Sequence, residues 1–193
     1  MSVVLKRGLL LSAIFALFLL QGCATSVKAN ATQNPAPKEA FASFGRIIVK
    51  PAIFKDGYSG DISGLLKIND NIQKDLAGPL ESWNKRPANG RTLVIQPVVE
   101  EIQFQHGAKR VLLGPLAGSS GVLLRLNVTD TEGNSVARPE FFQRAAAMAA
   151  GFVFGVHDNL MLTRVANLAS GYVISNYSTA VGGPTGADDK ALR

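Results

Sequence analysis

Hydrophobic positions between Phe44 and Tyr177 follow two periods, which predict strands and helices in one domain. The run from Phe44 to Ile53 is short and rich in branched aliphatic residues, which predicts a buried strand. From Leu65 to Trp83 apolar residues recur every third or fourth position, which predicts an amphipathic helix that is kinked or restarted at Gly78-Pro79. We expect Trp83 to pack in the core at the end of this helix.

Two longer strands follow, at Thr92–Phe104 and Val122–Thr129, and the second alternates apolar and polar residues. Pro97 predicts that the first strand lies at an edge or is bulged there. The adjacent Glu100 and Glu101 should point to opposite faces. A hairpin turn at 130–134 leads to a short strand at Ser135–Arg138.

The C-terminal third predicts helices. Pro139 begins an Ala-rich stretch that predicts a helix over Phe141–Ala150, and Asp158 can cap a last helix. Its inward residues are Met161, Val165, Leu168, Tyr172 and Val173. The element order favours an α+β fold: a small mixed or antiparallel sheet of about four strands, with two or three helices packed mainly on one face.

Residues 1–22 have the organisation of a secretory signal. Lys6 and Arg7 precede an apolar stretch from Leu9 to Leu20 that only Ser12 interrupts. This stretch is shorter than the ~20 residues that a membrane-spanning helix needs. A plain cleaved signal peptide and a short membrane anchor are the alternatives.

Leu20-Gln21-Gly22-Cys23 resembles the bacterial lipobox. In lipoprotein precursors, the cysteine thiol receives a diacylglyceryl group and the chain is cut before the cysteine, here between Gly22 and Cys23. The resemblance implies membrane anchoring through acylated Cys23. Ala24, in place of an aspartate, implies an outer-membrane address with the domain facing the periplasm.

The pattern divides the chain into four parts. Residues 1–22 form the signal peptide, 23–40 a lipidated N-terminus and flexible tether, 41–177 the periplasmic α+β domain, and 178–193 a disordered tail. The tether has no hydrophobic period and contains two prolines, and the tail is rich in glycine and aspartate.

Composition narrows the chemistry. The chain of 193 residues has a net charge of +6, one cysteine and two histidines. One cysteine excludes an internal disulfide and a multi-cysteine zinc site. We identify no catalytic, cofactor-binding or metal-binding residues. A triad of Ser119, His157 and Asp158 is disfavoured because adjacent His and Asp side chains usually diverge.

The glycine-rich segment Gly114–Gly121 lacks the Gly-Lys-Ser/Thr ending of a phosphate-binding loop. With the preceding basic pair, it makes a candidate interaction loop of Lys109, Arg110, Ser119 and Ser120. Lys109, Arg110 and Arg125 could form a basic patch, and contact of this patch with anionic lipid or glycan phosphates is an alternative to a solvated face. No aromatic residues are interleaved with the basic ones, so we expect no nucleic-acid partner.

The segment from Phe44 to Tyr177, with Gly107-Ala108-Lys109-Arg110 and a strand ending in Thr129-Asp130, resembles small Gram-negative lipoprotein domains of unknown function. Their fold is similar to the N-terminal domain of the translocation protein TolB. The resemblance implies a cell-envelope role.

The sequence therefore predicts a non-enzymatic, lipid-anchored envelope protein. Its domain would bind another envelope component, a protein or a peptidoglycan-associated one, in an assembly or secretion complex, by strand addition at a sheet edge or by loop docking. The alternative is a carrier of lipid or another apolar ligand in a cavity lined by Phe141–Phe154. A periplasmic hydrolase ranks behind both.

Overall fold

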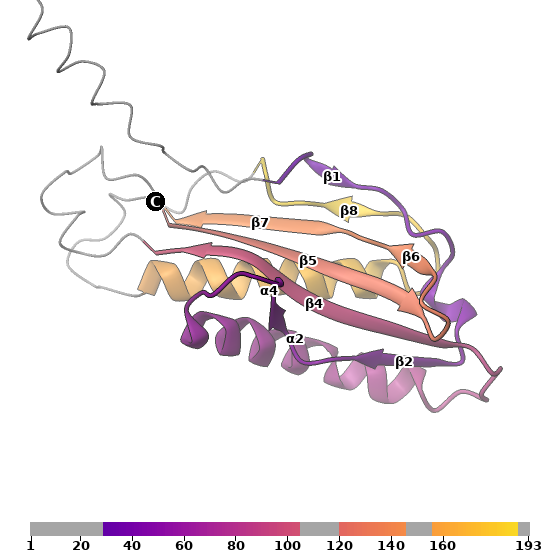
Figure 1. Cartoon of the computed structure of the whole chain (residues 1–193). Coiled ribbons are helices and arrows are strands. Elements are labelled where there is room, and N and C mark those ends of the chain that lie inside the picture. The colour runs from indigo at the N-terminus through magenta and orange to yellow at the C-terminus, as the bar shows by residue number, and fades with distance from the viewer. Residues whose placement is uncertain (1–28, 105–119, 146–155, 189–193) are drawn as a thin grey trace, which may run out of the picture.

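Two helices cover one face of a mixed sheet, and a two-stranded ribbon pairs an N-terminal segment with a C-terminal one (Figure 1). The computed structural model describes residues 29–104, 120–145 and 156–188. The elements are, in chain order, β1 (Gln33–Asn34), the 3-10 helix η1 (Phe41–Ser43), β2 (Arg46–Val49), β3 (Ile53–Phe54), α2 (Ile62–Trp83), β4 (Thr92–Gln103), β5 (Ser120–Asp130), β6 (Ser135–Ala137), β7 (Glu140–Ala145), α4 (Val156–Ser175) and β8 (Gly183–Pro184).

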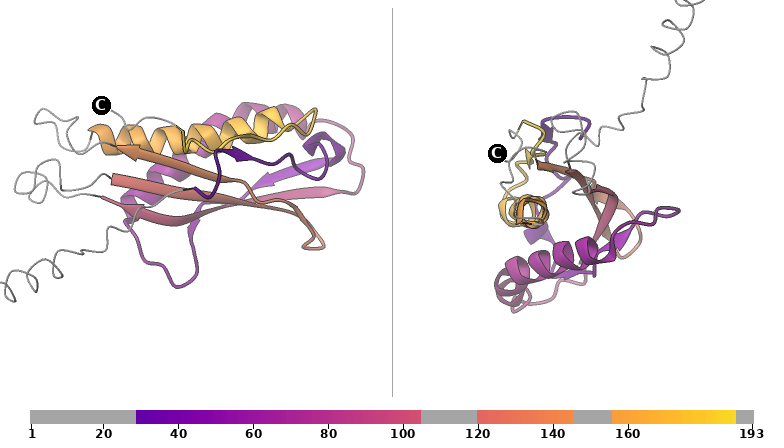
Figure 2. Two further views of the ribbon diagram at one scale, coloured as in Figure 1. Left: turned by 90° about the horizontal axis from the view of Figure 1, so that it is seen from above. Right: turned by 90° about the vertical axis from the view of Figure 1, so that its left-hand side faces the viewer.

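The main sheet has six strands. Its order is β2-β4-β5-β6, with β3 also paired to β4 and β7 also paired to β5. β2 and β3 run parallel to β4, whereas β5 is antiparallel to β4, β6 and β7. Figure 2 shows both helices on the same side of this sheet. The predicted α+β class, a mixed sheet with helices on one face, is confirmed.

Pro97 lies within a central strand, so the prediction of an edge or a bulge at this residue is wrong. It pairs with Leu126 of β5, and on its other side β2 ends opposite Ile95 while β3 begins opposite Val98. The proline, which has no N–H, therefore lies at the break between two short parallel strands, where no strand pairs with it on that side.

The bulge in β4 comes two residues later, between Val99 and Glu101. Val99 and Ile102 both belong to the hydrophobic core although three positions separate them. The extra residue turns both Glu100 and Glu101 away from the core. The prediction that they occupy opposite faces is wrong.

Helix α2 confirms the predicted stripe, because Ile68, Ile72 and Leu76 are buried. It begins at Ile62, where the Asp61 carboxylate accepts a hydrogen bond from the Gly64 N–H at 2.7 Å. It continues through Pro79, so the predicted restart there is wrong. Trp83, at its end, packs against the core and stacks on Tyr177, with ring centroids 4.0 Å apart. The predicted core position of Trp83 is confirmed.

Helix α4 spans Val156–Ser175 and packs against α2. It begins two residues before the predicted cap at Asp158. All five residues predicted to face inward are buried or pack against the core. The last predicted helix is confirmed.

The predicted helix over Phe141–Ala150 is wrong in its described part. Glu140–Ala145 form strand β7, in which Phe141 pairs with Leu124. Phe141 lies in the core, while Phe142 packs on the other face against Ala29. Two consecutive aromatic residues buried on opposite sides suit a strand, and this outweighs the helix propensity of the alanines. Residues 146–150 lie outside the described residues.

Both chain ends are ordered where they are described, contrary to the predicted flexible tether (23–40) and disordered tail (178–193). β1 pairs antiparallel with β8, and the fully buried Asn176 bonds to the backbone of Val181 and Gly182. Gly182 has φ of +80°, and a Cβ there would come within 2.5 Å of the Asn34 carbonyl oxygen. Amide hydrogen bonds order these segments, and a hydrophobic pattern does not record them.

Candidate interaction surface

The face of the main sheet opposite the helices, here called the open face, carries a line of charged side chains. On β5, the guanidinium of Arg125 bonds to Glu100 of β4 and to Glu140 of β7, each at 2.5 Å. The line continues to Lys55 Nζ, 3.3 Å from Glu100, and to Asn30, whose amide donates to Glu140 at 2.9 Å. It crosses the whole width of the sheet.

This line is partly removed from water. The side chains of Glu100, Glu140 and Arg125 are 9%, 16% and 23% exposed. Burial alone would raise the pKa of Glu140, but the hydrogen bonds and charge of Arg125 outweigh it, so that the pKa lies below its usual value. Glu140 therefore stays ionised at neutral pH, and Arg125 holds two carboxylates on the open face.

Beside this line, the outer edge of the open face is basic and aliphatic. Val49 and Phe54 pack against the core, so alternation turns their neighbours outward. Ile48 and Ile53 are 38% and 46% exposed. We call the outward residues of this edge the β2–β3 stripe, which consists of Arg46, Ile48, Lys50, Ile53 and Lys55.

Asparagine side chains hydrogen-bond to the free backbone groups of one residue on each edge of the sheet. On β2, Asn84 Oδ1 accepts from the Ile47 N–H at 2.8 Å, and its Nδ2 donates to the Ile47 carbonyl at 2.9 Å. On β7, Asn34 makes the same two bonds with Glu140, both at 2.8 Å. Each amide satisfies the groups that an added strand would use. Strand addition, predicted as a contact mode, is blocked at these positions.

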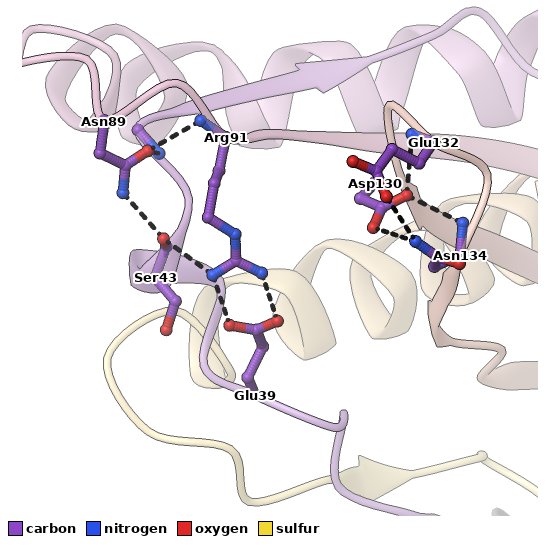
Figure 3. A network of polar contacts seen from close by, with 8 residues as sticks. Glu39, Ser43, Asn89, Arg91, Asp130, Glu132 and Asn134 are labelled. Atoms are coloured by element: carbon purple, nitrogen blue, oxygen red, sulfur yellow. Dashed lines mark hydrogen bonds and ion pairs between the residues drawn. The ribbon is translucent and has the colours of Figure 1, made fainter.

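The 3-10 helix and the turns at one end of the sheet are held by polar contacts (Figure 3). Arg91 makes a bidentate pair with Glu39, at 2.8 and 2.6 Å, and this lowers the pKa of Glu39. The Asp130 carboxylate accepts from the Asn134 side chain and from the backbone N–H groups of Glu132 and Asn134, which lowers the pKa of Asp130. These groups are occupied with each other and serve the turns.

The predicted site residues fall mostly outside the described residues. This holds for Gly22 and Cys23 and, in the candidate interaction loop, for Lys109, Arg110 and Ser119. Ser120 is described: it is buried as the first residue of β5 and pairs with Ala145. Its burial differs from the exposed loop position that we predicted.

The segment proposed to line a carrier cavity is part of the packed core where it is described. The Phe141 ring lies 5.8 Å from the Tyr172 ring in an edge contact. The Tyr172 hydroxyl donates to the Pro35 carbonyl at 2.9 Å, and burial raises the pKa of Tyr172 to about 12. Phe141–Ala145 therefore join the sheet to α4, and this part of the segment gives a carrier no support.

Two further findings concern the described residues only. They hold no group of three or more His, Cys, Asp or Glu side chains placed to bind a metal ion. Among them, neither α2 nor α4 combines the length and apolarity required to cross a membrane.

No protein-family model matches the chain, and no curated protein matches it. Among solved structures, it is similar to the PelC dodecamer from Paraburkholderia phytofirmans at 14% identity, with a TM-score of 0.45, over 77% of this chain and 96% of that one. A point variant of the same dodecamer gives 14% identity and a TM-score of 0.45 over 76% and 95%. The hypothetical protein CT253 from Chlamydia trachomatis gives 13% identity and a TM-score of 0.40 over 69% and 99%. Similarity at this level transfers no function.

Sequence reasoning missed the ion line and the asparagine contacts. Glu100, Arg125 and Glu140 lie on three strands, and β7 was predicted as a helix, so their meeting could not be anticipated. Asn34 and Asn84 lie in segments with no periodic signal. A polar residue directly after a predicted helix, as Asn84 is, was the one available signal.

Proposed function

We propose that this chain is a bacterial lipoprotein, anchored in the outer membrane by acyl chains on Cys23, with its α+β domain in the periplasm. The observation that carries the proposal is the string Leu20-Gln21-Gly22-Cys23 after a basic start and a short apolar stretch. A thiol is the side chain nucleophilic enough for this acylation. Two or three acyl chains anchor a protein stably, whereas one chain anchors it only marginally.

The proposed role of the domain is non-enzymatic binding of another envelope component, a protein or a peptidoglycan-associated one, in an assembly or secretion complex. The open face supports a role in contact, because neither helix covers it and its edge exposes Ile48 and Ile53. Since asparagines block strand addition at positions on both edges, the envelope component would be bound by the candidate interaction loop, with Lys109, Arg110 and Ser119 as contact residues.

Replacing the cysteine tests the anchor. Cys23→Ala should abolish incorporation of labelled palmitate and remove the protein from the outer-membrane fraction, because no other thiol is present. Thr25→Ala, two residues further on, leaves the lipobox intact and should behave as wild type. A Cys23→Ala protein that still sediments with outer membrane would contradict the proposal.

Charge reversal tests the loop. Lys109→Glu with Arg110→Glu should weaken in-cell crosslinking to the partner about tenfold, because two surface charge contacts are replaced by repulsion. The matched control reverses Lys67 and Lys74, which are exposed on α2. Equal crosslinking by both double variants would remove Lys109 and Arg110 from the interface.

A further inference from the structure

The route of the N-terminal segment brings the open face close to the anchor. Ala29, the first described residue, is 2% exposed and packs with Phe142 and Leu123. Leu123 and Phe142 alternate with the core residues Leu124 and Phe141, so they point to the open face. The chain therefore reaches the domain on the face that the helices leave uncovered.

Little chain remains between this contact and Cys23. Six residue steps separate Cys23 from Ala29, and an extended chain of that length spans at most about 20 Å. A flexible tether over 23–40 would have allowed a wider separation, but residues 29–40 are held on the domain by the pairing of β1 with β8 and by hydrogen bonds from Asn30, Asn34 and Lys38. An acyl group on Cys23 would therefore hold the part of the open face around Leu123 and Phe142 within this short reach of the lipid.

The β2–β3 stripe on this face has the chemistry of a surface that contacts anionic lipid. The segment from Arg46 to Lys55 contains three cations and no acid; the next acid is Asp56, in the following turn. The Lys55 side chain is 57% exposed and shares its charge with Glu100. Within the described part of the chain, Arg46 and Lys50 have no ion-pair partner, so their charges are available to lipid phosphates.

Ile48 and Ile53 lie between these cations and supply the apolar contacts. Interfacial segments combine basic side chains, which attract anionic headgroups, with aliphatic ones, which enter the acyl boundary. The polar line from Lys55 to Asn30 connects the stripe to the point where the chain leaves the domain. The stripe and the anchor can therefore reach the same bilayer.

We propose that the β2–β3 stripe docks on the anionic headgroups of the membrane in which Cys23 is anchored, so that the domain lies on the bilayer with its open face toward the lipid. This inference rests on the proposed acylation of Cys23. A stripe that stays away from the lipid, and is therefore free for a protein partner, is the alternative outcome of the test.

The test places a probe on either side of the domain. In the acylated protein Cys23 is blocked, so Ile48→Cys carries a unique thiol for a fluorophore. Ile174→Cys, 44% exposed on α4, is the matched control on the helix side. Both full-length lipoproteins are reconstituted into vesicles of phosphatidylcholine alone or of phosphatidylcholine and phosphatidylglycerol mixed two to one, and doxyl lipids provide the quencher.

We expect strong quenching at position 48 and weak quenching at position 174 in anionic vesicles. Neutralising Arg46→Gln and Lys50→Gln should weaken docking by about fivefold each, because each basic residue near an anionic surface contributes about that factor. High salt should act in the same direction. Equal quenching at the two positions, or stronger quenching at 174, overturns the docking.

Two readouts separate the docking from the anchor. A protein that is acylated and co-floats with vesicles but shows no quenching at 48 refutes the docking and leaves the anchor standing. A protein that is not acylated refutes both. Quenching at 48 that is equal in neutral and anionic vesicles refutes the role assigned to Arg46 and Lys50.

Discussion

The two faces of the main sheet differ in what covers them and in what holds them. Toward the helices, Leu124, Leu126 and Val128 of β5 are at most 1% exposed and belong to the hydrophobic core. On the open face, the same strand presents Leu123, Arg125 and Asn127, which are all partly exposed. One strand thus separates an apolar interior from a surface held by ion pairs.

This difference separates stability from contact. On the covered face, the side chains at these positions of β5 are all apolar and buried, so their burial contributes to the free energy of folding. The open face keeps exposed isoleucines and partly buried charges, a combination typical of a surface that contacts another one. We therefore assign most of the folding stability to the covered face, and under the proposed function we assign contact with another surface to the open face.

The largest expected effect comes from truncating the two neighbouring leucines of β5. Leu124→Ala should lower the free energy of unfolding by about 3–4 kcal/mol, since it leaves a cavity in the core. Leu123→Ala removes the same atoms from the open face and should cost about 1–2 kcal/mol. Urea denaturation followed by circular dichroism measures both. Equal costs would contradict the assignment of stability to the covered face.

The ion line should give the next largest effect. Arg125→Met leaves Glu100 and Glu140 without their shared cation and should cost about 2 kcal/mol at pH 7. Arg138→Met, at an exposed position, should cost less than about 0.5 kcal/mol. An equal cost for the two variants would show that the line contributes nothing to stability.

The loss at Arg125 should also depend on pH. Because the folded-state pKa of Glu140 is lowered, its ionisation stabilises the fold above the unfolded-state pKa, and this contribution disappears as the pH falls through the lowered value. The difference between wild type and Arg125→Met should therefore shrink on acidification. Denaturation at pH 7 and pH 3 measures it, and a constant difference would contradict the pairing.

The smallest effect is expected at the edge of the sheet, on strand β2. Asn84→Ala removes both bonds to Ile47 and should cost about 1 kcal/mol, while exposing the edge of β2 to self-association. The adjacent Lys85→Ala loses only an exposed pair with Glu81 and should be neutral. Denaturation and sedimentation velocity test the two variants. Association of Lys85→Ala to the same extent would remove Asn84 as the protector of the edge.

The covered face was the predictable part of this molecule. Its period of three to four in α2 and of two in β5 follows from burial on one side, so the pattern predicted both elements and their inward residues. The prediction of a helix over Phe141–Ala150 failed because Phe141 and Phe142 are followed by alanines, which favour a helix. The two aromatic side chains are instead buried on opposite faces of a strand. The prediction at Pro97 failed because a central strand tolerates a proline where its neighbouring strand is interrupted. That interruption, between β2 and β3, lies in another part of the chain.

The open face was not predictable in the same way. Arg125, Glu100 and Glu140 form one line only because three strands align in register. The order of the chain ends depends on two asparagines. The Asn34 amide bonds to Glu140, more than 100 positions away, and the Asn176 amide bonds to Val181, five positions away. Contacts of this kind leave no period in the sequence. Of the four contact residues predicted in the candidate interaction loop, only Ser120 lies among the described residues.

The proposed anchor at Cys23 underlies both the proposed function and the proposed orientation of the open face. The intact mass of the protein extracted from membranes tests it most directly. We predict a chain that begins at Cys23 and carries the mass of a diacylglyceryl group, with or without a further acyl chain on the new amino group. A chain that retains residues 1–22, or that carries an unmodified Cys23, would contradict the account.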